Sequence, residues 1–130
     1  MRLKLPLLGI LTALALQAQA AEFISTNLYV VAKDQVVADE QWVLAGISEI
    51  EGTFKNDLFI TSGNPLLLNG TVEGNIWGAA GVEANLAGEC KRNVRLTGKT
   101  VRIDGTIGGN LMALAETIII GTNAVVGGNV

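Results

Sequence analysis

Few residues in this chain could carry out chemistry, and the sharpest candidate is the stretch Thr97-Gly98-Lys99-Thr100. A phosphate-binding P-loop has a glycine, four residues and then Gly-Lys-Ser/Thr, so that backbone N–H groups can close around a phosphate. Here Asn93 stands in place of the first glycine, and residues 101–105 are typical of a strand and a turn instead of a helix. We therefore predict a structural role for this stretch and no nucleotide cofactor.

The remaining nucleophiles and bases are also sparse. The chain has no histidine, which removes His-dependent catalytic triads, a His general base and most zinc sites. Its only cysteine, Cys90, shares a repeat position with Val72 and Ile107, so we expect a buried thiol and no disulfide. Acidic residues form no recurring close pair of the glycosidase kind. We predict no enzyme, no cofactor and no metal.

The stretch Asn69-Gly70-Thr71 matches a glycosylation acceptor, but it recurs as part of a pattern. Glu51-Gly52-Thr53 and Asp104-Gly105-Thr106 fill the same position in neighbouring units, at steps close to 18 residues. We interpret the glycines as bends of an internal repeat, because Gly commonly marks turns. Gly46, Gly63, Gly81 and Gly98 form a second recurring column.

A third marker is a polar residue followed by an apolar one. The repeat is strong over residues 51–130, with steps of 17 to 19 residues, and weak over 27–50. In a stacked repeat Asp57, Asn75, Asn93, Asn110 and Asn129 would lie one above another and could form a hydrogen-bonded ladder. The pairs are Asn27-Leu28, Gln41-Trp42, Asp57-Leu58, Asn75-Ile76, Asn93-Val94, Asn110-Leu111 and Asn129-Val130.

Within a unit, apolar and polar residues alternate, which is typical of strands with one buried face. Three short strands in 17 to 18 residues make one coil, so the sequence predicts an all-β, single-domain β-solenoid of about six coils. The alternatives are a β-meander with Asn-Gly hairpins, or a left-handed helix suggested by the hexapeptide-like residues 118–130. We expect these residues in the interior: Phe54, Leu58, Val72, Ile76, Val94, Leu111 and Ile120.

The first twenty residues have the layout of a secretory signal peptide. Arg2 and Lys4 precede an apolar run too short to span a bilayer, and Ala18-Gln19-Ala20 resembles a cleavage site. We predict a signal peptide over 1–20 and a β-helix domain over 21–130, with 27–50 as irregular first coils. The protein would then be exported, periplasmic or secreted, with no transmembrane span in the mature chain.

Removal of Arg2 and Lys4 leaves seven basic and twelve acidic residues, a net charge of −5, which does not indicate nucleic acid as a partner. One basic cluster stands out in this acidic chain. It could offset acidic neighbours on adjacent coils, or form a docking face for an anionic glycan or protein. Its members are Lys91, Arg92, Arg95, Lys99 and Arg102.

The units at 51–63, 69–81 and 104–116, "EGTFKNDLFITSG", "NGTVEGNIWGAAG" and "DGTIGGNLMALAE", resemble the bactofilins, or polymer-forming cytoskeletal proteins. The resemblance covers most of residues 21–130. It implies a right-handed, three-sided β-helix that polymerises end to end without nucleotide, has no catalytic residues and scaffolds other envelope or cell-shape proteins. Bactofilins are mostly cytoplasmic, so the export signal marks a departure from the family.

The sequence and the resemblance together predict a non-enzymatic, self-assembling scaffold of the bacterial envelope. The expected contacts are the end coils, represented by Leu28, Val126 and Val130, because uncapped solenoid ends expose core residues and strand edges. Expected partners are further copies of the chain, and envelope proteins or anionic polysaccharide. The alternative is a monomeric binding module that uses the basic residues of 91–102.

Overall fold

The computed structural model describes residues 21–130, which form strands β1 to β16 and no helix. The predicted signal peptide lies outside the described residues. The strands are β1 (Glu22–Val31), β2 (Val36–Val37), β3 (Gln41–Ile50), β4 (Thr53–Phe54), β5 (Leu58–Ser62), β6 (Leu66–Leu68), β7 (Thr71–Val72), β8 (Ile76–Ala80), β9 (Glu83–Leu86), β10 (Glu89–Cys90), β11 (Val94–Thr97), β12 (Thr100–Ile103), β13 (Thr106–Ile107), β14 (Leu111–Leu114), β15 (Thr117–Ile120) and β16 (Val125–Val126).

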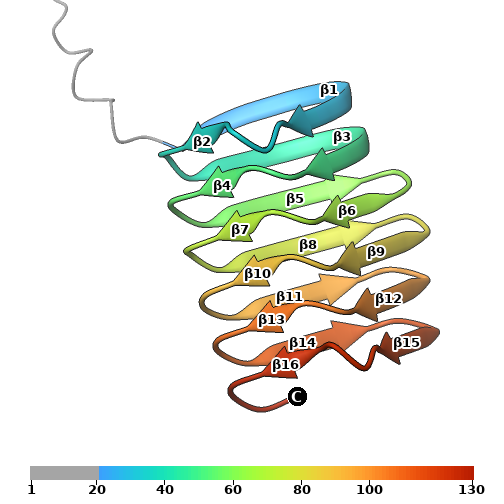
Figure 1. The fold of residues 1–130 in the computed structure, drawn as a ribbon. Coiled ribbons are helices and arrows are strands. Elements are labelled where there is room, and N and C mark those ends of the chain that lie inside the picture. The colour runs from blue at the N-terminus through green and yellow to red at the C-terminus, as the bar shows by residue number, and fades with distance from the viewer. Residues whose placement is uncertain (1–20) are drawn as a thin grey trace, which may run out of the picture.

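The strands stack in three parallel columns, which we call the first, second and third faces of a rod (Figure 1). The first face holds β3, β5, β8, β11 and β14, and the second holds β3, β6, β9, β12 and β15. The third face holds β2, β4, β7, β10, β13 and β16. Strand β3 bends between its pairing with β5 and its pairing with β6, so it serves two faces, and β1 lies beside it.

The chain visits the three faces in the same order in every coil, which confirms a β-solenoid of about six turns. The β-meander alternative is wrong, because the paired strands of the described chain are parallel and a hairpin requires antiparallel partners. Each inner coil is stabilised by hydrogen bonds to the coils above and below it, as the strand pairing requires.

The core is a column of side chains that alternate with outward ones along each strand. Six of the seven predicted interior residues are buried, among them Phe54 and Leu58, which have no exposed surface. Burial of an aliphatic or aromatic side chain contributes about 1.5–3 kcal/mol, so this column is the main favourable term in folding. The seventh, Ile120, pairs in register with buried Ile103 but lies on the last coil and is half exposed.

Glycines occur at all three corners, for a reason that differs from the prediction. No described glycine has a positive φ, so the turns do not need the conformational freedom of glycine. At the corner between the second and third faces, a Cβ on Gly70, Gly88 or Gly105 would meet the carbonyl oxygen of the glycine one coil above. These positions require glycine because successive coils approach too closely there for any side chain.

The polar ladder marks the third corner, and the predicted column is confirmed. Its rungs run from side chain to backbone: Asp57 Oδ1 accepts the Asn75 N–H at 2.7 Å, and Asn75 Oδ1 accepts the Asn93 N–H at 3.0 Å. The backbone N–H groups of Asn110 and Asn129 continue the pattern, each 2.8 Å from the Oδ1 atom of the asparagine one coil above. Each of these side-chain oxygens of the ladder therefore accepts a hydrogen bond from a corner N–H group that has no partner in the sheets.

The predicted alignment of the two polar–apolar pairs before residue 50, Asn27-Leu28 and Gln41-Trp42, with the later repeats was wrong. Gln41, and not Trp42, pairs with Leu58, and Glu22 lies above Gln41 in the same column. Leu28 instead pairs with Ile47, half a strand further along. The error arose because β1 and β3 are each ten residues long and continue across two faces. The number of residues between the corner and the polar position therefore differs from that in the later coils.

Candidate functional site

The last coil exposes side chains that point into the core of the rod. Ile118 and Ile120 pair in register with Val101 and Ile103, which are fully buried, yet they are 46% and 50% exposed. They are exposed because no coil of the described chain stacks on their open side. The free edges of β14, β15 and β16 lie at the same end, so apolar area and unpaired backbone groups occur together.

The predicted assembly residues lie at the two ends. Val126 pairs with Ile107 and is half-buried against the core, whereas Val130 follows the last rung of the ladder and is 82% exposed. Leu28 belongs to the first coil, at the opposite end of the rod. It is exposed beside Ile47 at the corner between the first and second faces, so it is not part of the interior of that coil.

The first two coils differ from the last coil in carrying polar groups toward the core. Gln41 is buried, and its Nε2 donates to Glu22 Oε1 at 2.6 Å. Tyr29 donates its hydroxyl to Gln41 Oε1 at 3.3 Å. Burial raises the pKa of Tyr29 to about 12, and the nearby carboxylate of Glu22 acts in the same direction. The N-terminal end is thus partly closed by a hydrogen-bonded network, while the C-terminal end is apolar.

The predicted basic cluster is spread around the rod. Arg95 points outward from β11 on the first face, and Arg102 points outward from β12 on the second. Lys99 lies in the turn between these two strands, and Lys91 and Arg92 lie at the corner between the third and first faces. The five side chains form a belt around one stretch of coil, so they do not combine into one docking face.

Ion pairs form along the rod, both between neighbouring coils and within one coil. Lys55 and Glu73, one coil apart at the corner between the third and first faces, are joined by a salt bridge at 3.3 Å. Lys91 lies one coil further along the same column, so basic and acidic side chains alternate there. Arg102 contacts Asp104 at 3.6 Å. Exposed pairs of this kind contribute about 0–1 kcal/mol, so they mainly reduce repulsion.

The residues with possible chemistry occupy structural positions. Cys90 pairs with Val72 and Ile107, is buried as predicted, and donates its thiol to the Gly74 carbonyl oxygen at 3.3 Å. Burial raises the pKa of the Cys90 thiol, which keeps it protonated and unreactive. The Thr97–Thr100 stretch forms the turn between β11 and β12, and a strand follows it.

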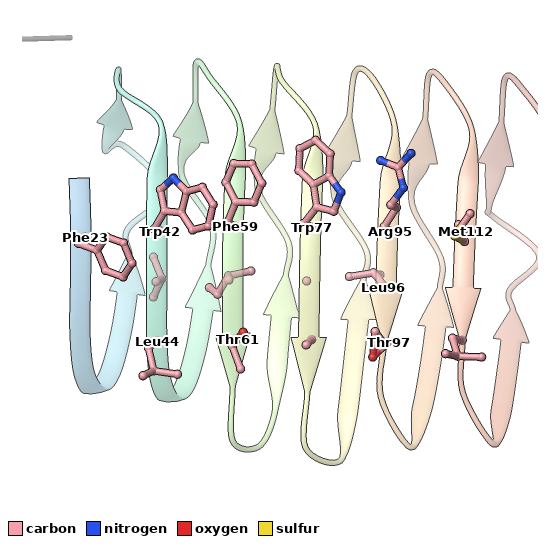
Figure 2. Close-up of a pocket in the computed structure, with 15 residues that line it drawn as sticks. Phe23, Trp42, Leu44, Phe59, Thr61, Trp77, Arg95, Leu96, Thr97 and Met112 are labelled. Atoms are coloured by element: carbon pink, nitrogen blue, oxygen red, sulfur yellow. The ribbon is translucent and has the colours of Figure 1, made fainter. Parts of the chain in front are cut away.

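Sequence reasoning missed a column of aromatic side chains on the outer surface of the first face. Phe23, Trp42, Phe59 and Trp77 occupy the same position on four successive coils, and we call them the aromatic column (Figure 2). The ring centroids of Trp42 and Phe59 are 4.0 Å apart, and those of Phe59 and Trp77 are 4.6 Å apart. The chain has only six aromatic residues, so the recurrence of four at steps of 17 to 19 was a readable signal.

No group of three Asp, Glu or Cys side chains within residues 21–130 could hold a metal ion. The same residues include no helix that could cross a membrane. Comparisons with protein-family models, with curated proteins and with solved structures gave no match. Function must therefore be inferred from the ends and faces of the rod.

Proposed function

We propose that this protein is a non-enzymatic scaffold that assembles end to end through the edge strands of its terminal coils. The observation that supports it is the contrast between Ile118 and Ile120, which are about half exposed, and their fully buried counterparts one coil above. A second copy at this end would cover both side chains and pair the free edges of β14, β15 and β16. Strand addition of this kind uses the same contacts that hold successive coils together.

The apolar part of this contact is appreciable. Full burial of an isoleucine is worth about 1.5–3 kcal/mol, so covering the exposed halves of Ile118 and Ile120 contributes about 1.5–3 kcal/mol together. Each strand hydrogen bond formed at the edge adds about 1 kcal/mol net. The polar network of Glu22, Gln41 and Tyr29 makes the other end less apolar. We therefore expect the C-terminal end to contribute most of the binding free energy.

The experiment compares two lysine substitutions on adjacent residues of β15. In Ile120→Lys the ammonium group lies in the contact, and its burial without a partner costs several kcal/mol. In Ile119→Lys the ammonium group points outward from the second face, as Arg102 does one coil above. The full chain and both variants are expressed with residues 1–20 present, purified, and studied by negative-stain microscopy and sedimentation over a broad concentration range.

We expect filaments that lengthen with concentration for the unmodified chain and for Ile119→Lys. Ile120→Lys should remain as single particles while circular dichroism still reports β structure. Monodisperse monomers of the unmodified chain at all concentrations would refute the scaffold function. Filaments of Ile120→Lys equal to those of the unmodified chain would show that this end is not the contact.

The cellular location of the assembly is inferred from residues 1–20. We propose that residues 1–20 direct export and that the scaffold works in the bacterial envelope, with envelope proteins or anionic polysaccharide as further partners. Cell fractionation of the full chain, with N-terminal sequencing of the recovered product, measures both export and cleavage. Recovery of the uncleaved chain from the cytoplasm alone would contradict the envelope setting and leave the assembly contact untouched.

A further inference from the structure

A groove runs along the outer surface of the first face, parallel to the axis of the rod (Figure 2). The aromatic column forms one wall, which continues through Arg95 and Met112, and the backbone between the two walls forms the floor. The groove encloses about 640 Å³, within the range of about 300–1,000 Å³ that is usual for ligand sites. The second wall lies two residues further along each strand and consists of Leu44, Thr61, Ala79, Thr97 and Leu114.

The charge on this face differs from that of the chain as a whole. Acidic residues outnumber basic ones in residues 21–130, yet no acidic residue lines the groove, and Arg95 is its one charged lining residue. The guanidinium group of Arg95 lies over the Trp77 ring, 5.3 Å from the centroid. Thr97, on the same strand, stands across the groove from it. The groove therefore has a cationic, hydroxyl-bearing position at β11, and from β8 to β1 its lining is apolar except for the hydroxyl of Thr61.

The stacking within the aromatic column restricts what can bind. Trp42 is stacked between Phe23 and Phe59, and Phe59 between Trp42 and Trp77. The remaining face of Trp77 is covered by Arg95. Sugars bind aromatic rings by lying on their faces, and neighbouring side chains already occupy both faces of Trp42, Phe59 and Trp77. An aliphatic chain needs only continuous apolar surface, which the groove offers.

We propose that this groove binds one unbranched fatty acid, with its carboxylate on Arg95 and Thr97 and its chain running along the aromatic column toward Phe23. From β11 to β1 there are four coil steps, which at about 4.8 Å each give about 19 Å of apolar groove. Guanidinium groups bind carboxylates with short, charge-assisted hydrogen bonds. The occupant is a single dissolved molecule, because a flat bilayer would contact the tops of both walls and leave the groove unfilled.

The two tryptophans of the chain both belong to the aromatic column, so intrinsic fluorescence reports directly on the groove. Palmitate brominated on its chain is titrated below its critical micelle concentration, and the quenching of tryptophan emission is recorded. We expect saturable quenching with one site per chain. Arg95→Gln should weaken binding about tenfold, the effect of losing a charge-assisted hydrogen bond. Arg102→Gln, an arginine of the same coil on the second face, is the matched control and should bind as the unmodified chain does.

A second variant tests the apolar part without changing charge. Ala79 has the smallest side chain of the second wall. Ala79→Phe adds a ring there, which narrows the groove beside Trp77. We expect loss of palmitate binding with an unchanged circular dichroism spectrum. Retained affinity in both Ala79→Phe and Arg95→Gln would overturn the proposal, as would the absence of saturable quenching.

Two other outcomes assign the face to another partner and also overturn the proposal. Quenching by vesicles of phosphatidylcholine and phosphatidylglycerol with brominated chains, without any response to dissolved palmitate, would identify a bilayer surface. A tryptophan emission shift that depends on protein concentration in the absence of lipid, with no palmitate binding, would identify a second copy. These readouts differ from filament assembly, because neither Arg95 nor Ala79 lies at an end of the rod.

Discussion

The close approach of coils at the corner between the second and third faces makes a quantitative prediction for Gly88→Ala. The added Cβ would fall on the Gly70 carbonyl oxygen and 2.6 Å from the carbonyl carbon of Asn69. The same Gly70 oxygen accepts the Glu89 N–H at 2.9 Å, so it cannot move away without weakening that hydrogen bond. The substitution must therefore shift backbone that is held on both sides by neighbouring coils.

The magnitude follows from three contributions. Overpacking costs about 1–3 kcal/mol, and the weakened hydrogen bond costs about 1 kcal/mol. The lower entropy of the unfolded chain with alanine offsets about 0.4–1 kcal/mol. The net loss is about 2 kcal/mol in the free energy of unfolding, which for a domain of this size lowers Tm by about 8 °C.

The matched control is Gly98→Ala, at the corner between the first and second faces. Its Cβ would meet three carbonyl oxygens at 3.4 Å, and its φ is not positive, so the added methyl fits. Urea unfolding followed by circular dichroism, at a concentration where sedimentation shows one species, should place Gly98→Ala within about 0.5 kcal/mol of the unmodified chain. If Gly88→Ala is equally neutral, lack of space is not the reason for the glycine column.

Two further predictions concern hydrogen bonds. The pKa of Tyr29 is about 12 in the folded protein and 10.0 without burial, so folding favours the protonated hydroxyl; its stabilising effect is complete below pH 10 and is lost as the pH rises to about 12. Unfolding measured against pH should show this decline, Tyr29→Phe should lack it, and the absorbance of this only tyrosine gives the pKa directly. Asn75→Ala removes the acceptor of the Asn93 N–H and should cost about 1 kcal/mol. Asn129→Ala removes an oxygen that no donor of residues 21–130 uses and should be neutral; equal losses in both variants would contradict the ladder.

The sequence by itself determined the β-solenoid, its coil length and its core. In a stack of coils each residue meets its counterpart one coil away, so a constant step in the sequence translates directly into a contact in space. The alternation around Val72, Val94 and Ile107 therefore predicted burial, and the Asn75 column predicted the ladder. Prediction was weakest where the step changed, at β1 and β3, which each cross two faces.

Only the tertiary structure decided what the rod presents outward. The basic residues between 91 and 102 are close in sequence, but successive outward positions turn from one face to the next, and the cluster becomes a belt. The aromatic column is the reverse case, because Phe23 and Trp77 are distant in sequence and are brought into one row by the register of four coils. The glycine corners likewise reflect the distance between coils, which depends on how the chain packs against itself and cannot be read from one unit alone.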